Sequence, residues 1–185
     1  MKPLNQILII FVHLVLPFTV FAGSKPASPE QVAKLTITAC ALSKNIQELD
    51  HINIYVMDNQ KIAQALKKYE NQQSGKVKIN SIISGKNLPE KRPTVLVCGN
   101  NEDCECIKNY CRKNKVLSIA ARPKSCRDGL SISLCQELSN LNKESLSQVK
   151  ILLNLEASLY EEIYWDRNIT YVSTIIRPRH IYAIR

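Results

Sequence analysis

Runs of hydrophobic positions, separated by short polar segments, divide the chain into predicted strands and helices. Residues 52–57 are apolar and rich in β-branched side chains, residues 77–83 begin with an apolar–polar alternation, and residues 94–98 are almost entirely apolar. The first two patterns are typical of strands, and the third is expected of a strand covered on both faces of a parallel sheet. Similar runs predict further strands at residues 115–120, 130–134, 149–153 and 169–176.

Helices are predicted between these strands, where apolar residues recur at helical spacing. Ser28 followed by Pro29 indicates the start of a first helix, which ends near residue 42. Asp58 and Asn154 are predicted to cap two later helices, because short polar side chains accept hydrogen bonds from the first turn. The later helices are expected at residues 58–69, 102–114 and 155–164.

The order strand, helix, strand, strand, helix, three strands and helix favours an α/β fold. We expect a single domain with a mostly parallel sheet of about five to six strands flanked by helices. The strand at residues 130–134, in which serines alternate with apolar residues, is expected to be half-exposed. The domain is expected to span residues 32–176, between a mobile tail at residues 23–31 and a basic tail at residues 177–185.

Residues 1–22 have the pattern of a secretory signal peptide. Lys2 supplies a positive start, residues 7–16 are almost all apolar, Pro17 interrupts the run, and cleavage is expected after Ala22. The apolar run is shorter than the ~20 residues of a membrane-spanning helix, although an uncleaved anchor is the alternative interpretation. The sequence therefore predicts export, to the periplasm of a bacterial cell, where thiols can oxidise.

The chain contains 25 Lys and Arg residues against 16 Asp and Glu residues, a formal net charge of +9. Basic proteins often bind nucleic acid, but an exported protein rarely meets it, so we expect no nucleic-acid partner. A membrane surface, an anionic envelope polymer or an acidic protein face suits the charge better. Because the basic residues are spread over many segments, a solvated basic surface is the simplest interpretation.

All seven cysteines follow the expected cleavage point, and cysteines of exported domains mostly form disulfides. The sequence therefore predicts a disulfide-stapled domain in which at least one thiol is left over. Cys126 and Cys135 flank a short loop and strand, and a bridge between them would add about 2–3 kcal/mol of stability. They are the favoured pair. The other disulfide candidates are Cys40, Cys98, Cys104, Cys106 and Cys111.

Four of these sulfurs allow a second interpretation, a periplasmic soft-metal or thiol redox site formed by Cys98, Cys104, Cys106 and Cys111. The Cys-x-Cys spacing does not match the usual spacing of structural zinc sites, but a soft ion such as Cu(I) tolerates it. Disulfides from this cluster to Cys98 or Cys40 are the simpler alternative. We therefore favour disulfides and expect no metal.

No pattern in the sequence indicates an enzyme. The chain has no nucleophile-elbow, phosphate-binding or zinc-protease motif, and its two histidines after the leader, His51 and His180, are far apart. Glu161 and Glu162 are interpreted as part of the solvated face of a helix. We expect a non-enzymatic protein without a cofactor. A third hypothesis is a small-ligand site at the carboxyl edge of the sheet.

Three segments, taken in order, resemble the YfiR-like periplasmic regulators. They are the strand at residues 52–57 with Asp58 after it, the two strands at residues 94–97 and 116–119, and residues 149–158. The last segment resembles the family's closing strand, its Asn-Leu step and its small-residue helix. Residues 173–176 stand where the family has a serine-led apolar helix. The resemblance covers about residues 32–176.

The resemblance implies a small exported α/β protein, and it adds a homodimer as an expectation because family members are commonly dimeric. The characterised type binds the periplasmic part of an inner-membrane diguanylate cyclase and holds it inactive, and redox state or envelope stress relieves this inhibition. By resemblance, this chain is expected to bind a membrane-bound signalling protein such as a diguanylate cyclase and so to control cyclic di-GMP. The Cys126–Cys135 bridge is the part of the family's disulfide pattern that can carry over.

Overall fold

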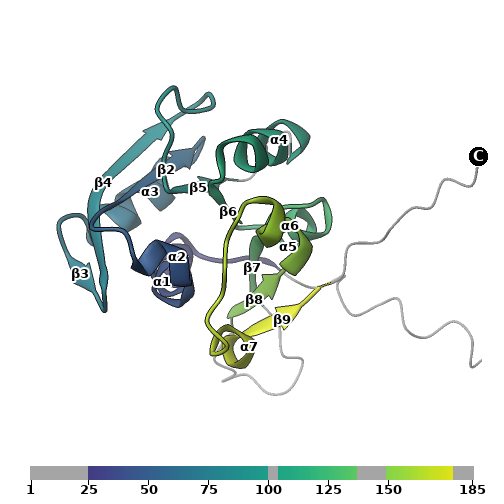
Figure 1. Cartoon of the computed structure of the whole chain (residues 1–185). Coiled ribbons are helices and arrows are strands. Elements are labelled where there is room, and N and C mark those ends of the chain that lie inside the picture. Colours follow the sequence, from purple (N-terminus) through teal and green to yellow (C-terminus); the bar gives the residue numbers. More distant parts are fainter. Residues whose placement is uncertain (1–24, 100–103, 137–148, 177–185) are drawn as a thin grey trace, which may run out of the picture.

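The computed structural model describes residues 25–99, 104–136 and 149–176, which form a mixed sheet with helices on both faces (Figure 1). Eight strands follow the order β3-β4-β2-β5-β6-β7-β8-β9, and β1 pairs with β7 outside this path. The α/β fold with a mostly parallel sheet is confirmed, but the sheet has more strands than the five to six that the sequence predicts.

The strands are β1 (Lys25–Pro26), β2 (Ile52–Met57), β3 (Gln73–Ser74), β4 (Val77–Gly85), β5 (Val95–Cys98), β6 (Leu117–Ala120), β7 (Ile132–Gln136), β8 (Val149–Leu153) and β9 (Ser173–Ile175). The helices are α1 (Pro29–Leu42), α2 (Lys44–Gln47), α3 (Gln60–Lys67), α4 (Cys104–Asn114), α5 (Pro123–Arg127), α6 (Leu155–Tyr160) and α7 (Ile169–Val172).

Five neighbouring strands, β4-β2-β5-β6-β7, run parallel and form the centre of the sheet. Numbered along the chain from β2, they have the order 2-1-3-4-5, which is that of doubly wound sheets such as flavodoxin. Ligands of such folds bind at the carboxyl ends of the strands where the order reverses, here β2 and β5. Residues 100–103, which follow β5, lie outside the described residues, and with them lies part of the small-ligand site expected from the sequence.

The two faces of the sheet form separate hydrophobic cores. On one face, Ile52, Ile54 and Val56 of β2 pack in a cluster with apolar side chains of α1 and α3. On the other face, Leu96 of β5 packs with Ile107 of α4. Figure 1 shows α1 and α2 on one side of the sheet and α4, α5 and α6 on the other. This two-sided cover explains why β5 is continuously apolar.

Two of the three predicted helix caps are confirmed. The Ser28 hydroxyl accepts a hydrogen bond from the Gln31 backbone N–H, and the Gln31 side chain accepts one from Ser28, which completes a capping box at α1. Asn154 caps α6 through the backbone N–H of Ala157. The cap of α3 is Asn59 rather than Asp58, because Asp58 has a positive φ of 50° and turns the chain away from β2.

The sequence predicts a single strand at residues 169–176, and the resemblance implies a serine-led helix at residues 173–176. The structure shows neither. Residues 169–172 form α7, and residues 173–175 form β9, which pairs in parallel with β8. Ile169 is buried in the core and holds α7 against the domain. At the junction of the two elements, the Ser173 hydroxyl donates to the Ile169 carbonyl oxygen at 2.7 Å.

Tertiary packing also changes the expected exposure of two segments. Part of the expected mobile tail belongs to the fold, since β1 pairs with β7 and Ala27 is buried. The strand predicted at residues 130–134 was expected to be half-exposed, but Ser131 and Ser133 are as buried as Ile132. The Ser131 hydroxyl donates a hydrogen bond to Glu161 at the end of α6, and α5 packs against β7. The expected leader at residues 1–22 and the expected basic tail at residues 177–185 lie outside the described residues.

Candidate functional site

The cysteines are the first candidate residues that the sequence offers, as disulfide partners. No disulfide is present among the residues that the structure describes, so the disulfide-stapled fold is wrong for this part of the chain. The favoured Cys126–Cys135 pair is not formed: Cys126 is a buried thiol of α5, with its Sγ 3.4 Å from the carbonyl oxygen of Leu152. Cys135 lies in β7, opposite Lys150 of β8, and its side chain is outside the described part.

The four cysteines of the soft-metal interpretation lie on β5 and α4, and two of them, Cys98 and Cys111, belong to one buried apolar cluster. Cys98 ends β5, while Cys104, Cys106 and Cys111 are distributed along α4. Cys111 is buried in the core, Cys106 is exposed, and the Cys104 Sγ lies 3.8 Å from the Ser125 hydroxyl. Within residues 25–99, 104–136 and 149–176, no group of three or more His, Cys, Asp or Glu side chains is arranged to hold a metal ion.

Burial makes three of the thiols unreactive. It raises the pKa of Cys40 and the pKa of Cys126 to about 12. It raises the pKa of Cys111 further, and the nearby Glu161 carboxylate adds to that increase. Because the thiolate is the form that attacks electrophiles and binds metals, these three residues are packing residues at neutral pH.

Alkylation with iodoacetamide should therefore sort the cysteines by burial. At about pH 8, the native protein is expected to react first at Cys106 and then at Cys104, while Cys40, Cys111 and Cys126 react only after denaturation. Mass spectrometry of peptides from samples labelled with and without urea measures the order. A disulfide-linked peptide that contains Cys126, recovered before reduction, would contradict the structure.

Glu161 is the polar residue whose position differs most from expectation. It was interpreted as part of a solvated face, yet it is completely buried at the end of α6. Its carboxylate accepts hydrogen bonds from the backbone N–H of Ser118, at 2.9 Å, and from the hydroxyls of Ser118 and Ser131. Burial raises the pKa of Glu161 to about 7, although these hydrogen bonds lower it. The carboxyl group therefore anchors the end of α6 to the sheet beside β6 and β7.

The surroundings of Glu161 give it a positioning role. The Arg112 guanidinium lowers the pKa of Glu161 electrostatically, and it stacks over the Tyr160 ring, 4.6 Å from the ring centroid. A signal for this burial was present in the sequence. Ala157, Ser158 and Glu161 follow the cap Asn154 by three, four and seven residues, which places them on one face of a helix.

The connection between β4 and β5 leaves part of one sheet face without a helix. Both strands flank β2 in parallel, so residues 86–94 must cross the sheet, and such crossovers usually carry a helix. Here the crossover is a loop held by two tyrosines. The Tyr55 hydroxyl donates to the Asn87 carbonyl oxygen at 2.7 Å, and the Tyr110 hydroxyl donates to that of Pro89 at 3.3 Å.

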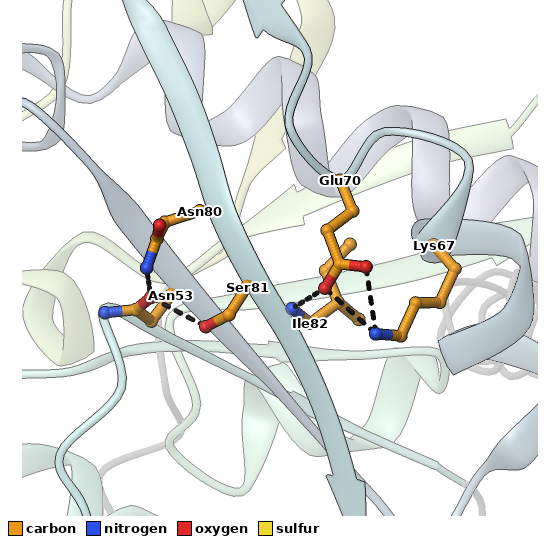
Figure 2. A network of polar contacts seen from close by, with 6 residues as sticks. All are labelled: Asn53, Lys67, Glu70, Asn80, Ser81 and Ile82. Carbon is orange, nitrogen blue, oxygen red and sulfur yellow. Dashed lines mark hydrogen bonds and ion pairs between the residues drawn. The ribbon is translucent and has the colours of Figure 1, made fainter.

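Beside this loop, a cavity of about 280 Å³ opens over the two strands; we call it the β2–β4 groove. Its polar floor is shown in Figure 2, where the Asn53 Oδ1 accepts hydrogen bonds from Asn80 at 3.0 Å and from the Ser81 hydroxyl at 2.7 Å. These contacts fill a β-bulge, because the register between β2 and β4 shifts after Ile52. The lining includes Asn53, Tyr55, Ser81, Ile83, Lys91 and Arg92.

The outer edge of β4 is covered near this bulge. The Glu70 carboxylate accepts the backbone N–H of Ile82 at 2.8 Å and forms an ion pair with Lys67 at 2.9 Å (Figure 2). The hydrogen bonds from Lys67 and Ile82 lower the pKa of Glu70. By satisfying an edge N–H, Glu70 keeps this part of β4 from pairing with another chain.

Exposed apolar side chains are concentrated near the C-terminal end of the described residues. Of the nine large hydrophobic residues that are exposed in the described part of the chain, seven lie between residues 155 and 175. Tyr171 is 84% exposed, and β9 is the last strand of the sheet order. We call this set the apolar C-terminal segment: Leu155, Leu159, Tyr160, Tyr164, Tyr171, Val172 and Ile175.

No protein-family model matches the chain, and no curated protein matches its sequence. The resemblance to YfiR-like regulators therefore stays a prediction that rests on three segments. Among the helices in the described ranges, none has the length and apolar character needed to cross a membrane. The features available for function are the groove, the apolar C-terminal segment and the anchor that Glu161 provides for α6.

Proposed function

We propose that the protein is an exported, non-enzymatic regulator that docks onto a membrane-bound signalling protein through its apolar C-terminal segment. The observation that carries this proposal is the concentration of seven exposed hydrophobic residues between residues 155 and 175. Exposed hydrophobic side chains beyond scattered single residues often mark an interaction site. The leader at residues 1–22 supports a location outside the cytosol, which is the periplasm in a bacterial cell.

The chemistry of this segment suits a protein partner. Three of its members are tyrosines, which are enriched at protein interfaces because they combine a large apolar ring with a hydroxyl. Among the described residues, β9 pairs only with β8, so its other edge offers backbone groups for pairing with a strand of the partner. The net charge of +9 favours a partner with an acidic face. In the YfiR-like regulators that the sequence resembles, the partner is a diguanylate cyclase.

The start of the segment is rigidly held. Glu161 ties the end of α6 to Ser118 and Ser131, and Arg112 packs over Tyr160. A surface that is already ordered loses less entropy when it binds. Disulfide oxidation is not part of the proposal, because no disulfide is present among the described residues.

Site-specific photo-crosslinking in the native host tests the proposal. With a photoreactive amino acid at Tyr171 of the full chain, we expect an adduct with a membrane-anchored protein that carries a signalling domain. The same amino acid at Gln64, an exposed position of α3, is the matched control and should give no such adduct. If the partner is a diguanylate cyclase, deletion of this chain is expected to raise cyclic di-GMP.

Three results would overturn the proposal. They are equal crosslinking from both positions, adducts from Tyr171 only with a second copy of this chain, and a chain that stays in the cytosol with its leader intact. The second result would leave the expected homodimer as the role of this surface.

A further inference from the structure

We propose that the β2–β4 groove binds a small organic carboxylate whose body is apolar and contains a ring. This site is separate from the apolar C-terminal segment, so the proposal does not depend on the docking function. The groove exists because a loop replaces the helix that usually follows β4, and its lining combines cationic, amide and apolar side chains. The cationic and amide side chains correspond to the carboxylate of the ligand, and the apolar side chains correspond to its ring.

The polar floor offers a hydrogen-bond donor. Both described hydrogen bonds to the Asn53 side chain, from Asn80 and Ser81, end on its Oδ1. Since Oδ1 is the acceptor, the Nδ2 group is a donor, and it has no acceptor among the described residues. Figure 2 shows this nitrogen turned away from Asn80 and Ser81. A carboxylate oxygen in the groove would satisfy this donor.

The cationic side of the groove is formed by Lys91 and Arg92. Neither forms an ion pair with a described carboxylate, and none of the lining residues is acidic. One Nη of Arg92 donates to the Lys115 carbonyl oxygen at 2.9 Å, which fixes the guanidinium and leaves its other N–H groups for a ligand. Donors therefore outnumber acceptors in this groove, and an anion is the complementary ligand.

The apolar side is formed by Tyr55 and Ile83. Ile83 of β4 is 57% exposed, because no helix covers this part of the sheet face. The hydrogen bond from Tyr55 to Asn87 holds the tyrosine ring in one place, so it is a fixed surface for an apolar ring. The cavity of about 280 Å³ lies just below the ~300 Å³ at which pockets for drug-sized ligands begin, so the ligand is small.

A second cationic cavity, of about 180 Å³, lies beside α4 and α6 and is lined by Lys108, Arg112 and Arg127. Asp128 and Glu156 line it as well, and Lys108 already forms an ion pair with Glu105. Its charges are therefore largely balanced within the protein. This contrast selects the β2–β4 groove as the anion site.

The proposal is tested by titrating benzoate into the ¹⁵N-labelled chain from residue 23 to residue 185, which lacks the expected leader. We expect saturable shifts of backbone signals in β2 and β4 with a Kd of about 1 mM or tighter. Benzamide, which lacks the charge, and acetate, which lacks the ring, are expected to bind at least about tenfold more weakly, a loss of 1.4 kcal/mol or more.

Variants separate the two sides of the site. Lys91→Gln and Ile83→Ser change exposed side chains, so the fold should be retained, and each is expected to weaken benzoate binding at least about fivefold. Lys61→Gln, at an exposed position of α3 away from the groove, is the matched control and should bind as the parent does. Absence of saturable shifts, equal binding of benzamide, shifts confined to the Arg112 cavity, or binding unchanged in both variants would each overturn the proposal.

Discussion

The protein is expected to lose stability as the pH rises from about 4.5 to about 7, and the substitution Glu161→Gln is expected to remove most of this loss. In the folded state, burial raises the pKa of Glu161 to about 7 from an ordinary value of 4.5. The unfolded chain therefore releases this proton at lower pH than the folded protein does. Between the two values the folded state binds more protons, so the free energy of unfolding falls with rising pH.

The size of the effect follows from the shift. A difference of about 2.5 pKa units corresponds to about 3 kcal/mol, which is present in full below pH 4.5 and absent above pH 7. Glutamine has the same shape and cannot ionise, and its amide can accept from the Ser118 N–H while it donates to a serine hydroxyl. The variant is thus expected to lack this pH dependence while it keeps the fold.

Urea unfolding followed by circular dichroism at several pH values measures the difference between parent and variant. Glu162→Gln is the matched control, because Glu162 is the next residue, is exposed, and forms a surface ion pair with Lys115. That change should alter stability by less than about 1 kcal/mol and leave the pH dependence intact. Parallel curves for the parent and Glu161→Gln would show that Glu161 is not a buried, titrating group.

Asn154→Ala is expected to destabilise the domain by about 3 kcal/mol. Asn154 is 1% exposed and links three elements through its side chain and backbone. Its Oδ1 accepts the Ala157 N–H of α6, its Nδ2 donates to the Cys126 carbonyl oxygen at 2.9 Å, and its own N–H donates to Ser131. Alanine removes the cap and one buried hydrogen bond to the Cys126 carbonyl oxygen, which also accepts from the backbone N–H groups of Asp128 and Gly129.

The loss of stability in Asn59→Ala is the comparison that isolates the contribution of the buried hydrogen bond from Asn154 to the Cys126 carbonyl oxygen. Asn59 caps α3 by the same geometry, with its Oδ1 accepting the Ile62 N–H at 3.0 Å, but it is only partly buried and has no second described contact of this kind. Its loss should cost about 1 kcal/mol. Thermal and urea unfolding of both variants measure the two values, and equal losses would contradict a structural role for the bond to Cys126.

The sequence alone was sufficient to predict those caps and strands that depend on interactions between residues a few positions apart. The caps at Ser28 and Asn154 depend on contacts three residues apart, so both were predicted, whereas the return bond to the Gln31 side chain was not. The strand at residues 52–57 was predicted with its observed bounds because its apolar pattern repeats along the strand itself. Asp58 was wrongly chosen as a cap, since a sequence does not show that the chain turns there with a positive φ.

Features that join distant residues were not predictable in this way. The cysteines were expected to bridge because of the expected compartment, but packing alone decides which sulfurs meet, and the Cys126 thiol points to Leu152. The contacts of Glu161 lie 43 and 30 residues away at Ser118 and Ser131, so only the folded sheet brings the donors together. The β2–β4 groove likewise follows from strand order, because β4 and β5 flank β2.

The sequence by itself determined the α/β class, the positions of most strands and two helix caps, because periodicity and capping act over a few residues. Only the tertiary structure decided that Glu161 is buried, that the described cysteines form no disulfide and that a groove opens where the crossover from β4 to β5 has no helix. The physical reason is that burial, pKa and side-chain pairing depend on neighbours brought close by the folded sheet, and these neighbours are remote along the chain.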